Sequence, residues 1–183
     1  MLATMREMRR HRILPAAVAT LALTAVAVSL HSAGAPAEPS APQALFKKTL
    51  LEDERTTPAI KELLQQRGGL VAPETVFADF TGDGRSDAVV LVETGGVAGA
   101  VALYLFSTEG MAEDSPLRAV FSSQRLYRAS VVVAGTTLIL RTPRYAQGDD
   151  VCCPARIVER LYTWSAKAKT LRQRSSREMH GPA

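Results

Sequence analysis

The only two cysteines of this 183-residue chain, Cys152 and Cys153, are adjacent. A disulfide between neighbours cannot join distant segments, so the fold must rest on its apolar core rather than on a cross-link. Adjacent α-carbons lie about 3.8 Å apart across a trans peptide, whereas ordinary disulfides prefer about 4.4–6.8 Å. A bond here would close a small, strained ring worth about 1.2 kcal/mol of chain entropy, against roughly 4.7 kcal/mol for a 100-residue loop.

The N-terminus has the three parts of a secretory signal peptide. Residues 1–12 are cationic, residues 13–30 form an apolar run without charge, and Ala35-Pro36-Ala37 fits the small-x-small cleavage pattern. We therefore predict a signal peptide over residues 1–37 and an exported protein, located in the periplasm, in the cell envelope or secreted. The alternative is an uncleaved membrane anchor, because an apolar run of about 18 residues is at the lower limit for a span.

Removal of 37 of the 183 residues leaves 146, which suits one domain able to bury about two thirds of its unfolded surface. The signal carries four arginines and one glutamate, so it accounts for +3 of the net charge of +4. In the rest of the chain, the excess of cations over anions lies in a basic C-terminal segment, residues 167–183, which we expect to be solvated. The charge therefore does not indicate a nucleic-acid partner, and we expect a monomer without a stable membrane span after cleavage.

Helix patterns precede strand patterns along the mature chain. Residues 38–42 are a flexible lead-in, and Gln43–Asp53 has a helical pattern. Thr57 caps a second predicted helix, which ends at Gly68-Gly69. Helices followed by successive strands predict an α+β fold over residues 43–166, with N-terminal helices and a mostly antiparallel β-sheet. The predicted strands are Thr75–Phe80, Ala88–Val92, Val101–Phe106, Leu117–Ser122, Ser130–Val133, Thr137–Arg141, Ile157–Trp164 and Thr170–Arg174.

The segment Asp79–Asp87 places oxygen ligands at alternate positions around Gly84, which permits a sharp turn. Hard cations such as Ca²⁺ take six to eight oxygen ligands, so we predict a structural calcium site of weak, extracellular type. The loop resembles the calcium loops of integrin-type FG-GAP and VCBS-like repeats, although Thr81 replaces a carboxylate. The alternative is a tight hairpin whose aspartates accept backbone N–H groups. The predicted ligands are Asp79, Thr81, Asp83, the carbonyl of Arg85, and Asp87.

The paired cysteines admit three states. An oxidising compartment and the even count favour a vicinal disulfide between Cys152 and Cys153. Two reduced, packed thiols are the second state. Metal binding by the thiolates, with Asp149 or Asp150, is the third, but His180 is the only histidine outside the signal, so a closed zinc site lacks partners.

Two motifs in order give the chain a family resemblance. A strand–D-x-T-G-D-G-x-x-D–strand unit lies within Phe77–Phe106, and G-D-x-x-C-C-P precedes an aromatic strand within Thr142–Trp164. This arrangement resembles the actinobacterial LppP/LprE-type lipoproteins and related secreted proteins. Their second motif usually reads C-C-P-S, where this chain has Ala155, and the lipid-bearing cysteine is absent. The resemblance implies an envelope or secreted location and supplies no catalytic residue.

The residues give little support to an enzyme. With one histidine left after cleavage, a Ser-His-Asp or Cys-His arrangement is weakly supported, and no H-E-x-x-H, Walker A or G-x-S-x-G motif occurs. The sequence therefore favours an exported, non-enzymatic binding or interaction module with an unknown envelope or extracellular partner. The alternative is a thiol-redox or metal-handling protein that uses Cys152 and Cys153.

Overall fold

The computed structural model describes residues 40–109 and 117–181. The chain divides between Ala37 and Glu38 into two units, and the description below concerns the second of them. The predicted signal peptide, residues 1–37, lies outside the described residues.

Both predicted helices are present, as α1 (Ala41–Glu52) and α2 (Pro58–Gln66). The N-cap of α2 is Thr57, as expected, but its backbone N–H and hydroxyl both donate to Oε1 of Gln124, at 3.0 and 2.8 Å. The cap therefore ties the helix to a strand instead of closing on its own first turn. Gly68, with φ +70°, lies just beyond the C-terminus of α2. Neither described helix is long and apolar enough to cross a membrane.

Five strands form the first sheet, here sheet A. Its order is β1-β3-β4-β5, β2 also pairs with β3, and all pairs are antiparallel. Strand β2 is shorter than predicted, and β1, too short to leave a sequence pattern, was not predicted. The strands are β1 (Leu70–Val71), β2 (Val76–Ala78), β3 (Asp87–Glu93), β4 (Ala100–Phe106) and β5 (Ala119–Gln124).

Four consecutive strands form a second sheet, here sheet B, in the order β6-β7-β8-β9 with antiparallel pairs throughout. The N-terminal helices and the antiparallel pairing are confirmed and the fold is α+β-like but mostly β, whereas the expectation of one sheet is wrong. Between β5 and β6, Arg125 and Arg128 adopt positive φ angles of 62° and 47°, which redirect the chain into a second layer. The strands are β6 (Ser130–Ala134), β7 (Thr137–Arg144), β8 (Arg156–Ser165) and β9 (Thr170–His180).

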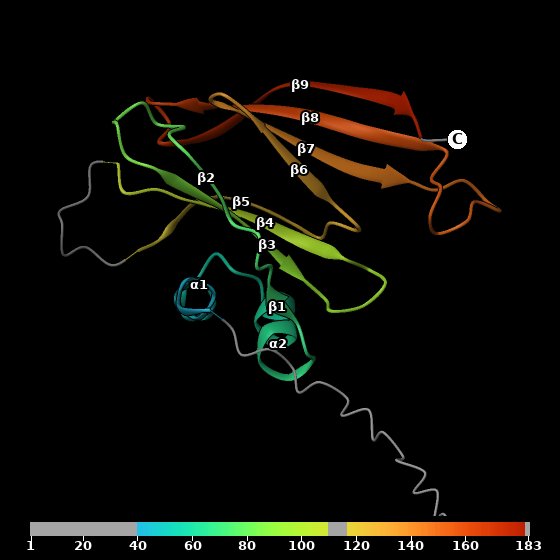
Figure 1. The fold of residues 1–183 in the computed structure, drawn as a ribbon, viewed down its shortest axis with the longest axis horizontal. Coiled ribbons are helices and arrows are strands. Elements are labelled where there is room, and N and C mark those ends of the chain that lie inside the picture. The colour runs from blue at the N-terminus through green and yellow to red at the C-terminus, as the bar shows by residue number, and fades with distance from the viewer. Residues whose placement is uncertain (1–39, 110–116, 182–183) are drawn as a thin grey trace, which may run out of the picture. The chain divides into compact units, whose positions relative to one another are not determined.

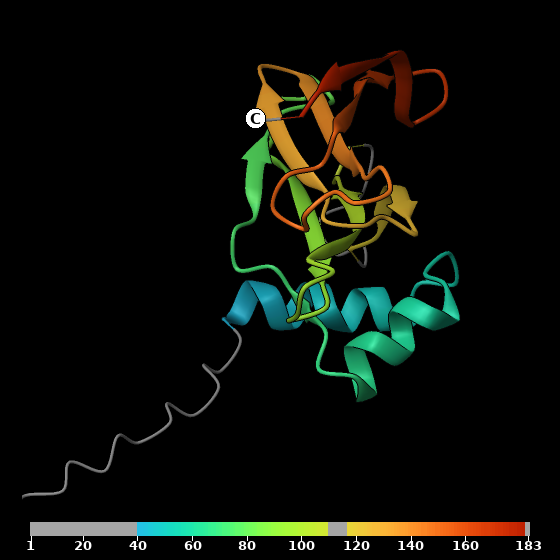
Figure 2. The same cartoon turned by 90° about the vertical axis from the view of Figure 1, so that its right-hand side faces the viewer.

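Three layers enclose two apolar cores, as Figures 1 and 2 show: the helices, then sheet A, then sheet B. Strand β3 contributes to both cores because its side chains alternate: Val90 and Val92 pack with the helices, whereas Val89 packs with sheet B. Sheet A is thus covered on both faces, which explains the uninterrupted apolar runs of β3 and β4. On sheet B, Leu138 and Leu140 point into the second core, so the alternate residues define an opposite, outer face.

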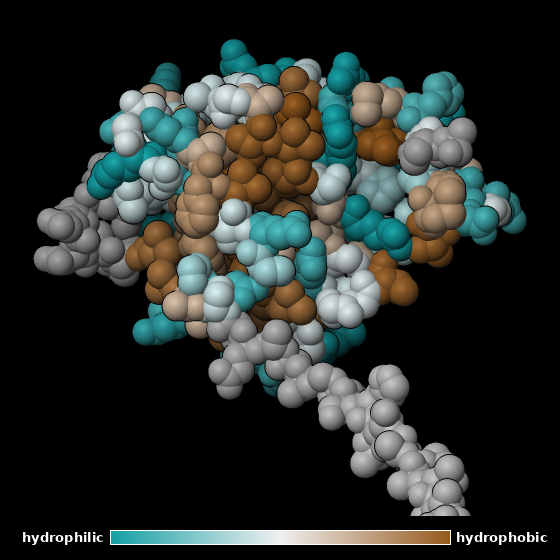
Figure 3. Space-filling model, in the orientation of Figure 1, coloured by the Kyte–Doolittle hydropathy of each residue, from teal (hydrophilic) through white to brown (hydrophobic). Residues whose placement is uncertain are grey.

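The two edges of sheet B differ in character. Strand β9 continues to His180, beyond the predicted Arg174, and its residues 172–178 are exposed and mostly charged or polar. Strand β6 is short and apolar, and its Val132 is 40% exposed. Figure 3 shows an apolar patch where Figure 1 draws β6 and its neighbours, surrounded by more hydrophilic side chains. Charge on β9 and shortness of β6 are two ordinary protections of a free sheet edge.

Candidate functional site

The acidic loop, residues 79–87, connects β2 to β3. Asp79 accepts the backbone N–H of Gly82 at 2.7 Å and that of Gly84 at 3.0 Å, and the Thr81 hydroxyl donates to it at 3.3 Å. Both glycines adopt positive φ angles near 80°, which L side chains rarely take. The carboxylate of Asp79 therefore organises the turn.

Asp83 accepts the backbone N–H of Arg85 at 2.9 Å and is paired with its guanidinium at 3.1 Å. The same guanidinium donates to the carbonyl of Thr108 at 2.7 Å. The backbone N–H of Arg85, and then its guanidinium, hold the pKa of Asp83 below its ordinary value. The pair anchors the tip of the acidic loop to the segment that follows β4.

Asp87 is only 2% exposed, at the first position of β3. One of its oxygens, Oδ2, accepts the backbone N–H groups of Phe80 and Thr81 at 2.8 and 3.1 Å. These bonds satisfy amides that turn inward at the end of β2, where no strand partner reaches them.

The structure thus brings the five predicted calcium ligands into one turn, and its aspartates accept hydrogen bonds from that turn. The backbone bonds to Asp79 and Asp83 are those of the hairpin alternative. Within residues 40–109 and 117–181, no group of three His, Cys, Asp or Glu side chains is placed to hold a metal ion. Calcium binding stays a prediction, and it would require Asp83 to release Arg85.

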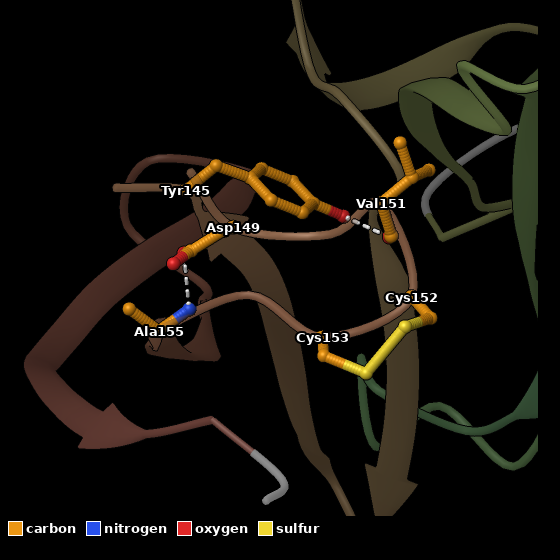
Figure 4. The surroundings of a disulfide bond; sticks show 6 residues. All are labelled: Tyr145, Asp149, Val151, Cys152, Cys153 and Ala155. Carbon is orange, nitrogen blue, oxygen red and sulfur yellow. Dashed lines mark hydrogen bonds between the residues drawn. A yellow bond between two sulfur atoms is a disulfide. The ribbon is translucent and has the colours of Figure 1, made fainter. Parts of the chain in front are cut away.

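The cysteine loop, residues 145–155, connects β7 to β8, and Figure 4 shows its interior. Cys152 and Cys153 form a disulfide with their α-carbons 3.8 Å apart, and both residues are exposed. The Tyr145 hydroxyl donates to the carbonyl of Val151 at 2.9 Å. Asp149 accepts the N–H groups at the two ends of the loop, from Ala146 at 2.7 Å and Ala155 at 2.6 Å. The loop is therefore held in shape by its own polar groups.

A pocket of about 210 Å³ lies where the cysteine loop meets the outer face of sheet B. Its sheet residues are neighbours by register, because Ser130 pairs with Arg141 and Pro143 pairs with Ile157. The lining combines donors and apolar groups and contains no acidic side chain. Its residues are Arg128, Ser130, Arg141, Pro143, Tyr145, Cys152, Pro154 and Ile157.

An ion-pair triad runs across sheet B beside this pocket. Glu159 of β8 is 1% exposed, and it pairs with Arg141 at 2.9 Å and with Arg177 at 2.6 Å. The hydrogen bond from Arg141, followed by that from Arg177, lowers the pKa of Glu159. Two arginines against one carboxylate leave the triad with a net positive charge.

Larger cavities, of about 420, 430 and 370 Å³, lie elsewhere in the part of the chain that the structure describes. The first two share Arg55 and Arg118. None of the three is lined by a residue of the predicted calcium site or by either cysteine. The pocket at the cysteine loop is the better candidate because a predicted site residue, Cys152, lines it.

Most of this pocket was missed by sequence reasoning, which found only the cysteines. Arg141, Pro143 and Tyr145 alternate along the chain, and such alternation was a usable signal that β7 continues past its predicted end and presents one face. Arg128 and Ser130 carried no such signal, because the register of β6 against β7 brings them in. Compared with protein-family models, curated proteins and solved structures, the chain matches none.

Proposed function

We propose that this protein is an exported, non-enzymatic binding module of the cell envelope or its surroundings, and that its ligand occupies the pocket beside Cys152. One observation supports this above all: the cysteine loop, the most unusual feature of the sequence, forms a wall of a pocket that also contains two arginines. The signal-like residues 1–37 and the family resemblance support export.

The lining favours binding over catalysis. It offers guanidinium and hydroxyl donors beside apolar surface, which is the ordinary composition of a recognition site. The hydroxyl of Ser130 has no histidine or carboxylate among the lining residues to act as its base. The sulfur atoms of Cys152 and Cys153 are joined and are not thiolate nucleophiles.

A fragment screen tests the binding site. The protein, purified after export by a bacterial host, would be screened by NMR against small carboxylic acids, phosphate esters and neutral sugars. We expect amide shifts centred on Tyr145 and Cys152. Ser130→Phe fills the pocket and should abolish them, whereas Ala134→Phe, on the same face of β6 but outside the pocket, should not. Absence of any shift at the pocket across the screen would reject the proposal.

Export is tested by mass. An exporting host should release a chain that begins at Glu38, with no full-length protein in its membranes. A membrane-bound chain that keeps residues 1–37 would support the anchor alternative instead.

We also propose that calcium stabilises the acidic loop, since oxygen-bearing residues recur there at alternate positions and meet in one turn. Titration calorimetry with millimolar Ca²⁺ should show heat that Asp83→Ala abolishes. Asp150→Ala, in the other loop, is the matched control and should leave the heat unchanged. Absence of heat in the unsubstituted protein would reject calcium binding.

The second candidate is a thiol-redox or metal-handling role, favoured by the exposure of both Cys152 and Cys153. In exchange with a dithiol substrate, the loop disulfide would be reduced to two thiols while the substrate forms a disulfide. Intact mass after alkylation, at equilibrium with dithiothreitol, would measure this reaction. A disulfide that resists millimolar dithiothreitol would count against the redox role, and failure of the reduced protein to bind Zn²⁺ would count against metal handling.

A further inference from the structure

We infer that the ligand of the pocket is a carboxylate carried on a ring, either an aromatic acid or a sugar acid. The carboxylate would lie between Arg128 and Arg141, and the ring would lie against the disulfide of the cysteine loop. The inference rests on the proposed binding function and adds the chemical class of the ligand.

The two arginines of the pocket have N–H groups that make no hydrogen bond within the described residues. Arg141 uses its Nε to bind Glu159, and its two terminal amino groups have no hydrogen-bond partner within residues 40–109 and 117–181. Arg128 donates one bond, from Nη1 to the carbonyl of Val97 at 3.2 Å, which leaves Nη2 free among the same residues. Two guanidinium groups with unused N–H donors are suited to a planar anion.

The position of Arg141 is fixed by the triad. Glu159 is covered by the side chains of Arg141 and Arg177, which hold it ionised, so the triad keeps one surplus positive charge. The hydrogen bond from Nε of Arg141 to the buried carboxylate of Glu159 also orients the guanidinium group. The charged lining residues of the pocket are arginines alone, and a neutral or cationic ligand would leave Arg128 and the surplus charge of the triad without a counter-charge.

The rest of the pocket lining is mostly apolar, and Tyr145 is held in place by its contacts. The hydroxyl of Tyr145 is bound to Val151, and its ring packs edge-on against Tyr127 with centroids 5.8 Å apart. Sulfur is polarisable and makes favourable contacts with rings, so Cys152 offers a flat apolar contact. The apolar lining residues are Pro143, Tyr145, Cys152, Pro154 and Ile157.

Size and charge narrow the ligand further. Pockets for drug-sized ligands are about 300–1,000 Å³, so a pocket of about 210 Å³ fits one small ring or the end group of a longer molecule. A carboxylate has two acceptor oxygens, which the two arginines can satisfy together.

Four probes and two substitutions test the inference. Benzoate and glucuronate represent the two sources of a ring carboxylate, and benzamide and glucose are their neutral counterparts. NMR titration of the exported protein should show binding of at least one acid at the pocket, about tenfold or more tighter than its neutral counterpart. Arg128→Gln and Arg141→Gln should each weaken that binding about tenfold or more. Arg144→Gln, on the same strand but outside the pocket, should change it little.

Each outcome has a distinct meaning. Binding of benzoate alone would assign the aromatic class, and binding of glucuronate alone the sugar class. Equal binding of acids and neutral counterparts at the pocket, or binding insensitive to both arginine substitutions, would overturn the carboxylate while leaving the binding site in place. Pocket shifts with other fragments but with none of these four probes would also overturn it. A pocket that binds no compound of the wider screen would reject the binding function itself.

Discussion

The acidic loop and the cysteine loop are both held by an aspartate that accepts backbone N–H groups, but the two aspartates have different surroundings. Each connects neighbouring antiparallel strands, and each contains an aspartate that accepts two backbone N–H groups, Asp87 in the first loop and Asp149 in the second. Asp87 is 2% exposed at the start of β3, whereas Asp149 is half-buried in the cysteine loop. The comparison teaches that the surroundings of a carboxylate, more than its bonds, decide whether it stabilises the fold or shapes a site.

The loops also differ in whether their side chains remain available to a ligand. Hydrogen bonds within the acidic loop occupy the carboxylates of Asp79 and Asp83. In the cysteine loop, Asp149 and Tyr145 fix the shape while Cys152 and Pro154 face a pocket. Of two loops that stand out in the sequence, the second therefore offers the better binding surface in the structure.

The largest expected effect is on the free energy of unfolding, and it distinguishes Asp87 from Asp149. Asp87→Ala leaves the buried N–H groups of Phe80 and Thr81 without an acceptor, and we expect a loss of about 3 kcal/mol in the free energy of unfolding. Urea denaturation measures it. Asp87→Asn, which keeps one acceptor oxygen, should cost less. A loss below about 1 kcal/mol for the alanine variant would show that other acceptors or water replace the carboxylate.

Asp149→Ala removes the same number of hydrogen bonds from the cysteine loop, but water can reach the amides of Ala146 and Ala155. We expect a loss of about 1 kcal/mol or less, together with shifted amide signals around Cys152. A loss of free energy of unfolding as large as that of Asp87→Ala would contradict the expected difference between the two aspartates.

Reduction of the disulfide should change the free energy of unfolding by about 1 kcal/mol or less, because a two-residue ring restricts the unfolded chain very little. Hydrogen exchange should speed up at the amides of the cysteine loop and stay constant in the acidic loop. Cys152→Ser/Cys153→Ser is the second variant and should reproduce the reduced protein. Global destabilisation in either case would show that the disulfide supports the core.

The smallest effect is a pH dependence confined to the acidic loop. Because the pKa of Asp83 is lowered in the folded state, its ionised form contributes stability that is fully present above its ordinary pKa of about 3.9. That contribution is lost as the pH falls through the lower folded value. The unsubstituted protein and Asp83→Asn should therefore differ in stability at pH 6 and converge near pH 2. A constant difference across this range would contradict the shift.

Local patterns in the sequence predicted most helices and strands, but they predicted little about which elements pack or pair with one another. The cap at Thr57 and the stop at Gly68-Gly69 placed α2 correctly, because capping signals are properties of neighbouring residues. The break between β5 and β6 was not visible, because positive φ angles at Arg125 and Arg128 are unusual for arginine. A single expected sheet became two for that reason.

The extension of β9 had a similar cause. Residues 175–180 are polar except for Met179 and lack the alternation of a half-buried strand, so they resembled a solvated tail. Register with β8 sets Arg177 opposite Glu159, and this ion pair favours the extended pairing. Such a partner is visible only after β8 and β9 are aligned.

The sequence by itself determined that Cys152 and Cys153 can shape only one loop, that Asp79–Asp87 is a turn rich in carboxylates, and that helices precede strands. These follow from covalent adjacency and from the spacing of residue types within a few positions. Only the tertiary structure decided which loop has a pocket beside it. The register of β6, β7 and β8 brings Ser130, Arg141 and Ile157 onto one face, and contacts between residues far apart in the chain have no local signal.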